Sequence, residues 1–371
     1  MKKTFDEVFE DRTKYGAKVK TDEYKECGSH IIIDQGQEQI AGYTDLEEGL
    51  LEEVPAIIFG DHTRVIKYVD EPFFLGADGV KVLRSKYENA NYKYLYYALK
   101  NANIPNTGYN RHFKWLKEVS IEYPNMDKQA EIVDILDRVN AVIEARQQEL
   151  QRLDELVKAR FVEMLGDVIH NDRNWEKHLF SDITTSRLGK MLDAKQQTGE
   201  YPFPYLGNAN VQWFRFDTSN LNQMDFNEAD QVEFALEDGD LLVCEGGEIG
   251  RCAVWHNQIQ PCYFQKAIHR VRCNKQLVLP DYLAWWFKFN CEHNGFSAIE
   301  GAKATIAHLP GAKLKQLQVV VPPIELQNRF IDLVAQLDKS KVVVQKALDE
   351  AQTLFDSLMQ KYFGTTDHEG V

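Results

Sequence analysis

Two long stretches of the chain carry apolar residues at alternating spacings of three and four positions. The first, from Met126 to Leu165, contains no Gly or Pro and is rich in Glu, Leu, Ala, Arg and Gln. It is therefore expected to form one helix about 60 Å long. Its series consists of Ile132, Leu136, Val139, Ile143, Leu150, Leu153, Val157 and Met164, with Arg146 and Arg160 completing the spacing. Such a series lines one face of a helix and is typical of a coiled coil.

The second stretch repeats the first at a constant offset of 198 residues, so that Gln129 and Gly166 recur as Gln327 and Gly364. Its series consists of Phe330, Val334, Leu337, Val344, Leu348, Ala351, Phe355, Leu358 and Tyr362, with Lys341 as the polar exception. A single amphipathic helix would most simply pack on its own globular domain. Because two matched copies exist, we expect the two helices to pack on each other.

The segments that precede the two helices also correspond, at an offset of 188 residues. In each segment a short alternating strand is followed by an aromatic amphipathic helix, at 91–101 and at 281–290. Upstream, an apolar strand leads into a Gly-bearing turn closed by Arg64 or Arg251. Elsewhere the pattern is typical of short strands separated by turn residues. Each segment is therefore expected to be an α+β domain with a curved, partly antiparallel sheet.

A sheet segment containing GDLLVCEGGEIGR, an apolar lead-in VVVPPIELQ and a long helix follow one another in an order that occurs twice. This arrangement resembles the specificity subunit of type I restriction-modification systems. The segment HIIIDQGQEQIAGYTD also resembles the start of a target-recognition domain of that family. The resemblance covers nearly the whole chain, and Pro-Pro-x-x-x-Gln before the second helix is its most specific motif. The first copy departs from it, with PNMDKQ for the double proline and GDHTR for GGEIGR.

The resemblance implies an α+β fold with two sheet-containing target-recognition domains. Each is followed by a long α-helix, and the two helices form an antiparallel coiled coil. On this basis the first target-recognition domain spans 1–124 and its helix 125–166. The second domain spans 167–321, its helix 322–364, and residues 365–371 form a tail.

The resemblance also implies sequence-specific DNA binding without catalysis. Each domain would read one half of a split double-stranded DNA sequence in the major groove. The helix pair would set the length of the unread spacer and dock two methyltransferase (modification) subunits. Motor and nuclease (restriction) subunits would join in the larger complex. The target bases and the spacer length do not follow from a single sequence.

The composition changes this picture in one respect. The formal net charge of -14 is the opposite of the basic footprint that phosphate binding usually leaves, so partner subunits are expected to supply positive charge. The six cysteines include no CxxC pair, and neither a metal nor a cofactor is expected. No apolar run is long enough to span a bilayer and the first residues do not resemble a signal peptide. A cytoplasmic protein without a membrane partner is expected.

Catalytic motifs are missing from the sequence. No Asn-Pro-Pro-aromatic tetrapeptide and no GxxxxGK[ST] phosphate loop occur, and Asp238 and Asp240 flank a glycine as turn residues do. Two other classes of protein stay open. One is a non-catalytic coiled-coil adaptor for protein interactions, and the other is a stand-alone DNA-modifying enzyme with an unrecognised site.

Candidate DNA contacts are loop residues of the types that read bases or hold phosphates. In the first half they are His62, Arg64, Asn106, Asn110, Arg111 and Lys114, with Tyr109 and His112 in the same loop. In the second half they are Arg187, Lys190, Asn208, Asn210, Arg251, Lys266, Lys303 and Thr305, with Lys195, Gln212, Gln265 and His308 nearby. Arg84 and Arg272 lie in alternating strands and are expected to support the sheet.

Overall fold

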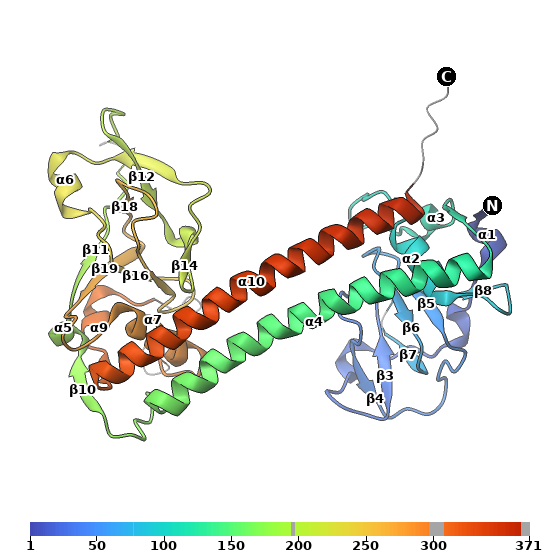
Figure 1. Ribbon diagram of the computed structural model, residues 1–371, viewed down its shortest axis with the longest axis horizontal. Coiled ribbons are helices and arrows are strands. Elements are labelled where there is room, and N and C mark those ends of the chain that lie inside the picture. The colour runs from blue at the N-terminus through green and yellow to red at the C-terminus, as the bar shows by residue number, and fades with distance from the viewer. Residues whose placement is uncertain (77, 194–196, 297–307, 365–371) are drawn as a thin grey trace. The chain divides into compact units, whose positions relative to one another are not determined.

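The computed structural model describes residues 1–76, 78–193, 197–296 and 308–364 (Figure 1). The chain divides into two compact units. The first is Met1–Glu149 with Val344–Val371, and the second is Leu150–Val343. Both long helices pass from one unit into the other, so the boundary falls within each of them.

In its described residues, the first unit has three small sheets and three short α-helices before the first long helix. Its strands are β1 (Lys2–Thr4), β2 (Phe9–Asp11), β3 (His30–Ile33), β4 (Gly42–Thr44), β5 (Ala56–Gly60), β6 (Ile66–Val69), β7 (Phe73–Leu75), β8 (Val80–Ser85) and β9 (Ser120–Glu122). Its helices are α1 (Phe5–Val8), α2 (Tyr92–Lys100), α3 (Phe113–Leu116) and the start of α4 (Met126–Leu165). The sheets have the orders β2-β8-β5-β6, β4-β3-β7 and β1-β9.

The second unit repeats this arrangement. Its strands are β10 (Glu176–Leu179), β11 (Thr184–Leu188), β12 (Pro202–Leu206), β13 (Val211–Gln212), β14 (Arg215–Phe216), β15 (Asn222–Asp225), β16 (Leu241–Cys244), β17 (Cys252–Val254), β18 (Tyr263–Phe264), β19 (Ile268–Cys273) and β20 (Gln318–Val321). Its helices are α5 (Phe180–Ile183), α6 (Glu228–Glu233), α7 (Pro280–Glu292), α9 (Gly311–Lys315) and the start of α10 (Ile324–Phe363). The sheets have the orders β11-β19-β16-β17, β15-β12-β18, β13-β14 and β10-β20.

The two globular segments share far more than the sequence pattern indicated. The four-stranded sheet, the three-stranded sheet with one parallel and one antiparallel pair, and the two-stranded ribbon all occur in both. The predicted aromatic helices are present as α2 and α7. Only a strand, a turn and an aromatic helix could be matched from the sequence, because the other strands are short and their side chains differ. The whole topology is duplicated, and among the described residues the second copy adds the β13-β14 hairpin and α6.

The two long helices are confirmed, and each unit shows them packed in opposite directions. In the first unit, Ile132 and Leu136 near the start of α4 share a core with Phe355 and Met359 near the end of α10. In the second unit, Phe161 near the end of α4 contacts Phe330 near the start of α10, their ring centroids 5.3 Å apart. The pairing is therefore antiparallel.

One position of the predicted helix interface is wrong. Arg160 was expected to continue the series, but it is exposed and forms an ion pair with Glu163. The buried residue is its neighbour Phe161, which is 1% exposed. Here α4 packs on α7 as well as on α10, because the Phe161 ring also contacts Tyr282 and Phe289 of α7. A second packing partner rotates the apolar face away from the strict three-four series.

A matched glutamine fixes the start of each long helix. Gln129 and Gln327 are both fully buried, and each side-chain amide donates to the carbonyl of the proline five positions earlier, at 2.9 and 2.8 Å. These bonds satisfy a carbonyl that lies just outside the helix. The recurrence of proline and glutamine in the sequence therefore has a structural cause.

Candidate nucleic-acid interface

In the first unit, Asp61 joins the turn after β5 to the loop before α3. Its backbone carbonyl accepts the N–H of His112 at 2.7 Å, and its carboxylate accepts the N–H of Phe113 at 2.7 Å. Asp61 is 4% exposed and His112 is fully buried. These bonds therefore hold two segments side by side, the turn that carries His62 and Arg64 and the loop 105–112.

Two of the predicted DNA contacts in this loop form the loop itself. The Asn106 side chain accepts the N–H of Gly108 at 3.1 Å, and the Asn110 amide donates to the carbonyl of Thr107. Gly108 has a φ of +78°, which favours glycine. These bonds close a tight turn that leaves Tyr109 exposed, followed by the exposed Arg111.

The remaining first-half candidates divide into supporting and protruding groups. Arg64 is half-buried and donates from Nη1 to the carbonyl of Ile104 at 3.1 Å, which ties its turn to the base of the loop. His112 was placed among the possible contacts, but it is buried, and its ring nitrogens face the Asp61 carbonyl and Thr107. Lys114 is exposed, with its ammonium over the Trp115 ring.

We call the backbone link between the turn after β5 and the loop before α3 the joint. The second unit contains an equivalent joint between the turn after β16 and the loop before α9. The carbonyl of Glu245, directly after β16, accepts the N–H of Leu309 at 2.7 Å, and Gly246 pairs with His308. His269 lies beneath this joint, with Nε2 3.1 Å from the carbonyl of Leu309. Burial lowers the pKa of His269, which keeps the imidazole neutral and its Nε2–H a donor to that carbonyl. Lys195, Lys303 and Thr305, which the sequence also suggested, lie outside the described residues.

Arg251 and Asn208 hold the turn after β16 against the turn after β12. The guanidinium donates to the backbone carbonyl of Asn208 at 3.0 Å and to its side-chain oxygen at 3.2 Å, and the Asn208 amide donates to Gly246 at 3.1 Å. Both residues are half-buried. Both were predicted as DNA contacts, and in the structure their hydrogen bonds shape the two loops.

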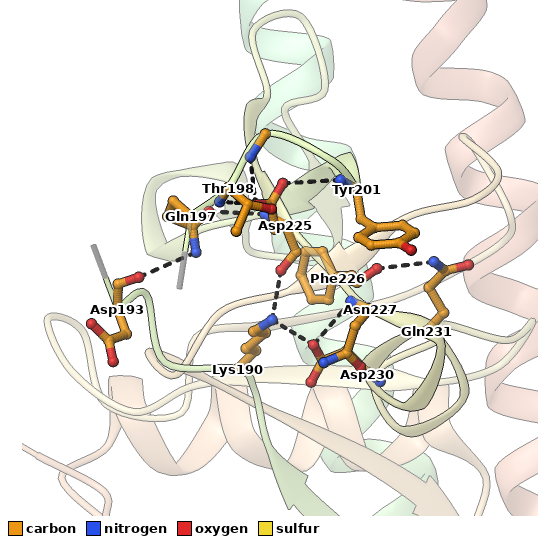
Figure 2. A network of polar contacts seen from close by, with 11 residues as sticks. Lys190, Asp193, Gln197, Thr198, Tyr201, Asp225, Phe226, Asn227, Asp230 and Gln231 are labelled. Carbon is orange, nitrogen blue, oxygen red and sulfur yellow. Dashed lines mark hydrogen bonds and ion pairs between the residues drawn. The ribbon is translucent and has the colours of Figure 1, made fainter. Parts of the chain in front are cut away.

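Lys190 is also held inside the domain (Figure 2). Its side chain is 11% exposed, and its ammonium donates to the carbonyl of Asp225 at 2.6 Å and to the carboxylate of Asp230 at 2.5 Å. The backbone carbonyl of Lys190 accepts the N–H of Lys266 at 2.9 Å. Lys190 therefore positions the exposed Lys266 and the half-buried Gln265, rather than protruding itself.

The Asp225 carboxylate closes the same network from the other side (Figure 2). It accepts backbone N–H groups of Thr198, Gly199 and Tyr201, the last two at 2.7 and 3.2 Å. Burial alone would raise the pKa of Asp225, but these bonds to the charged form lower it. The segment after residue 196 is thereby fixed to the end of β15.

Of the other second-half candidates, Asn210 and Gln212 help to form the turn after β12, and Arg187 lies on β11. Asn210 accepts from Gly207 at 2.9 Å and donates to Asp217 at 2.9 Å, and the Gln212 amide donates to Ala209 at 2.8 Å. Arg187 on β11 forms an ion pair with Glu233 and is about half-exposed. Its guanidinium also lies near the Phe234 ring.

The matched arginines of β8 and β19 support the sheets, as expected. Arg84 donates to the carbonyl of Pro55 at 2.5 Å, and Arg272 donates to the carboxylate of Asp240 at 2.7 Å. The hydrogen bond to Asp240 raises the pKa of Arg272. Asp240 also accepts the N–H of Glu237 at 2.8 Å, which explains it as a turn residue beside Asp238.

Two folded segments of one topology, each presenting a cluster of polar loops and carried on paired helices, define a recognition protein. The family model described as the type I restriction modification DNA specificity domain matches residues 1–155 and 172–351. The chain therefore belongs to the family of type I restriction-modification specificity subunits. It is a DNA-binding, non-catalytic subunit of such a system. Among the described residues, no helix is long and apolar enough to cross a membrane.

Individual relatives agree with this assignment. The chain is 22% identical over 351 residues to the EcoR124I/EcoR124II specificity subunit of Escherichia coli, covering 89% of this chain and 84% of that protein. It is 26% identical over 302 residues to a Haemophilus influenzae protein named as a type I restriction enzyme specificity subunit, covering 78% and 74%. The crystal structure of the S subunit from M. genitalium has the same fold, with a TM-score of 0.59, 17% identity, and 99% and 96% of the two chains covered.

Proposed function

We propose that this subunit reads a bipartite DNA target, with one half-site for each recognition domain. The observation that carries the proposal is the duplicated joint, Asp61 with His112 in one domain and Glu245 with Leu309 in the other. The same frame holds different side chains at equivalent loops. Two similar frames with unlike loops suit two unlike half-sites.

Exposure and hydrogen bonding divide the candidate residues into two roles. We propose that Arg111, Lys114 and Lys266, which are exposed, reach the DNA directly. Arg64, Lys190, Asn208 and Arg251 are engaged within the domains and set the shape of the loops. This second group affects sequence choice through loop geometry.

The proposed organisation follows the domain ranges expected from the sequence. The target-recognition domains are 1–124 and 167–321, the helices are 125–166 and 322–364, and 365–371 is a tail. The helix pair sets the unread spacer and docks two methyltransferase subunits, with motor and nuclease subunits in the larger complex. Because the net charge is -14, these partners contribute positive charge for holding the phosphates.

Exchange of one recognition domain tests the bipartite target. Residues 1–120 are replaced by the corresponding segment of another specificity subunit, and the methylated motif is mapped by single-molecule sequencing of host DNA. One half of the motif should change, and the reciprocal exchange of 167–321 should change the other half. A change of both halves by either exchange would contradict the modular assignment.

The non-catalytic role has a separate test. The purified chain should transfer no methyl group to DNA and cleave none, and methylation should appear on addition of its methyltransferase subunits. Activity of the chain alone would identify an unrecognised active site. Failure of the assembled complex to bind any DNA at low salt would favour a protein-interaction adaptor.

A further inference from the structure

Tyr109 stands out in the first unit because it is a large aromatic side chain that contributes nothing to a core. It is 88% exposed, the highest exposure among the large apolar and aromatic side chains of the described residues. Burial of a tyrosine normally removes a large apolar area from water. An isolated exposed tyrosine would be unremarkable, but this one is held in a fixed orientation.

The orientation comes from His62 in the neighbouring turn. The two rings are stacked, with centroids 4.8 Å apart and an interplanar angle of 10°. The backbone of His62 is anchored, because its N–H donates to the Gln35 side-chain oxygen at 3.2 Å, and its half-buried ring has Nδ1 shielded from solvent. One face of the Tyr109 ring is therefore backed by His62, and the high exposure leaves the opposite face and the edge open.

The backbone beneath Tyr109 is also fixed before any ligand arrives. The bonds of Asn106 and Asn110 close the turn, and the joint between Asp61 and His112 fastens its end. A side chain that is already ordered loses little conformational entropy on binding. The geometry is that of a preformed contact.

We propose that Tyr109 is a specificity-determining residue that presents its open face to the C5-methyl group of a thymine in the major groove of the first half-site. A ring with one face already covered cannot enter a base step with both faces, but it can cover one methyl group. Apolar contact is how proteins read the thymine methyl, which the other three standard bases lack. This inference rests on the proposed function, since it requires the first unit to read a half-site.

Removal of single methyl groups from the DNA tests the contact. The assembled complex with its methyltransferase subunits is titrated with duplexes of the mapped motif, in which each thymine of the first half-site is replaced in turn by deoxyuridine. Affinity is measured by fluorescence anisotropy at one salt concentration. One replacement should weaken binding of the unaltered complex by about fourfold, the effect of one methyl-sized group leaving a contact.

Variants decide whether Tyr109 makes that contact. Tyr109→Ala should bind thymine DNA about fourfold more weakly and lose all sensitivity to the critical deoxyuridine, whereas Tyr109→Phe keeps the ring and should keep the sensitivity. His62→Ala should reduce the sensitivity by freeing the ring. Tyr201→Ala, a 42% exposed tyrosine of the second unit, should leave the first half-site unaffected.

Three outcomes overturn the inference. They are a first half-site with no methyl-sensitive thymine, an unchanged deoxyuridine effect in Tyr109→Ala, and loss of the effect in Tyr201→Ala. Failure of the proposed function looks different, because exchange of residues 1–120 would then leave the motif unchanged or alter both halves. An altered half-site combined with a methyl effect independent of Tyr109 rejects the tyrosine contact alone.

Discussion

Asp61 has a structural role, because its carboxylate accepts the part-buried N–H of Phe113 at 2.7 Å. Asp61→Ala leaves that donor without a partner and should lower the stability of the first unit by about 1–3 kcal/mol. Asp61→Asn retains a side-chain oxygen and should cost less. Thermal unfolding measures the loss. The exposed Asp22→Ala serves as the control, and an equal effect of both alanine variants would contradict this role of Asp61.

Asp225 predicts a pH dependence of the second unit. Its pKa is lowered in the folded state, so its contribution to stability is complete above the unfolded pKa of about 3.8. That contribution is lost as the pH falls through the lower folded pKa. At pH values below about 4, the melting temperature of the unaltered chain should therefore decrease. It should decrease more steeply than the melting temperature of Asp225→Asn. Parallel pH profiles of the two proteins would show that this carboxylate does not contribute.

At the scale of single residues, the sequence indicates the loops better than it indicates the roles of their side chains. Asn110 and Lys190 have side chains suited to DNA, and both lie in loops of the expected kind. Their partners decide their roles, and the Lys190 partners Asp225 and Asp230 are 35 and 40 positions away. Such pairings depend on tertiary packing, which composition and spacing do not specify.

Among the elements, the end of α4 allows a test of which side chain lies at the helix interface. Phe161 is 1% exposed and its ring contacts α7 and α10, whereas Arg160 is exposed. Phe161→Ala should lower the free energy of unfolding of the second unit by about 3–5 kcal/mol through lost burial and the cavity left behind. Arg160→Ala and the 40% exposed Val162→Ala should stay within about 0.5 kcal/mol.

Denaturant unfolding monitored by tryptophan fluorescence measures this difference, since the ring centroids of Trp285 and Phe161 are 6.4 Å apart. If Arg160→Ala lowered the free energy of unfolding as much as Phe161→Ala, Arg160 would belong to the helix interface, as the three-four spacing predicts. If Phe161→Ala does not fold, Phe161→Leu provides a smaller cavity and the same order of effects is expected.

The long helices could be predicted from the sequence because their pattern extends over 40 residues in each. The strands could not be assigned as completely, since β13, β14 and β18 have only two residues each. An alternation needs several positions before it differs from chance. Periodicity also fails where a helix gains a second packing partner, as α4 does at Phe161.

For the whole molecule, the feature repeated in both halves is the connection between each domain and its long helix. Each domain is followed by a buried glutamine that starts a long helix, Gln129 or Gln327. The Lys341 ammonium of α10 forms an ion pair with Asp154 of α4 at 2.7 Å, so the polar exception in the second series has a partner on the first helix. Burial alone would lower the pKa of Lys341, but the bond to Asp154 raises it. The sequence pattern identifies Lys341 as a polar position in the series but does not indicate that Asp154 is its partner.

The helix pair provides the last prediction, because both helices cross the boundary between the two units at Glu149/Leu150 and Val343/Val344. Insertion of seven residues at each of these points adds one heptad to both helices and keeps the apolar series in phase. The added length is about 10 Å, close to three base pairs of DNA. The mapped motif should retain both half-sites and gain about three base pairs of spacer.

Control insertions test whether the helix pair sets the spacer length or only connects the two domains. A heptad in α4 alone leaves the two series unequal in length, so it should weaken assembly or methylation instead of giving a longer spacer. Five residues inserted in both helices rotate the following apolar positions by about 140° and should also reduce activity. A double heptad insertion that methylates DNA with the original spacer would show that α4 and α10 do not set the distance between the half-sites.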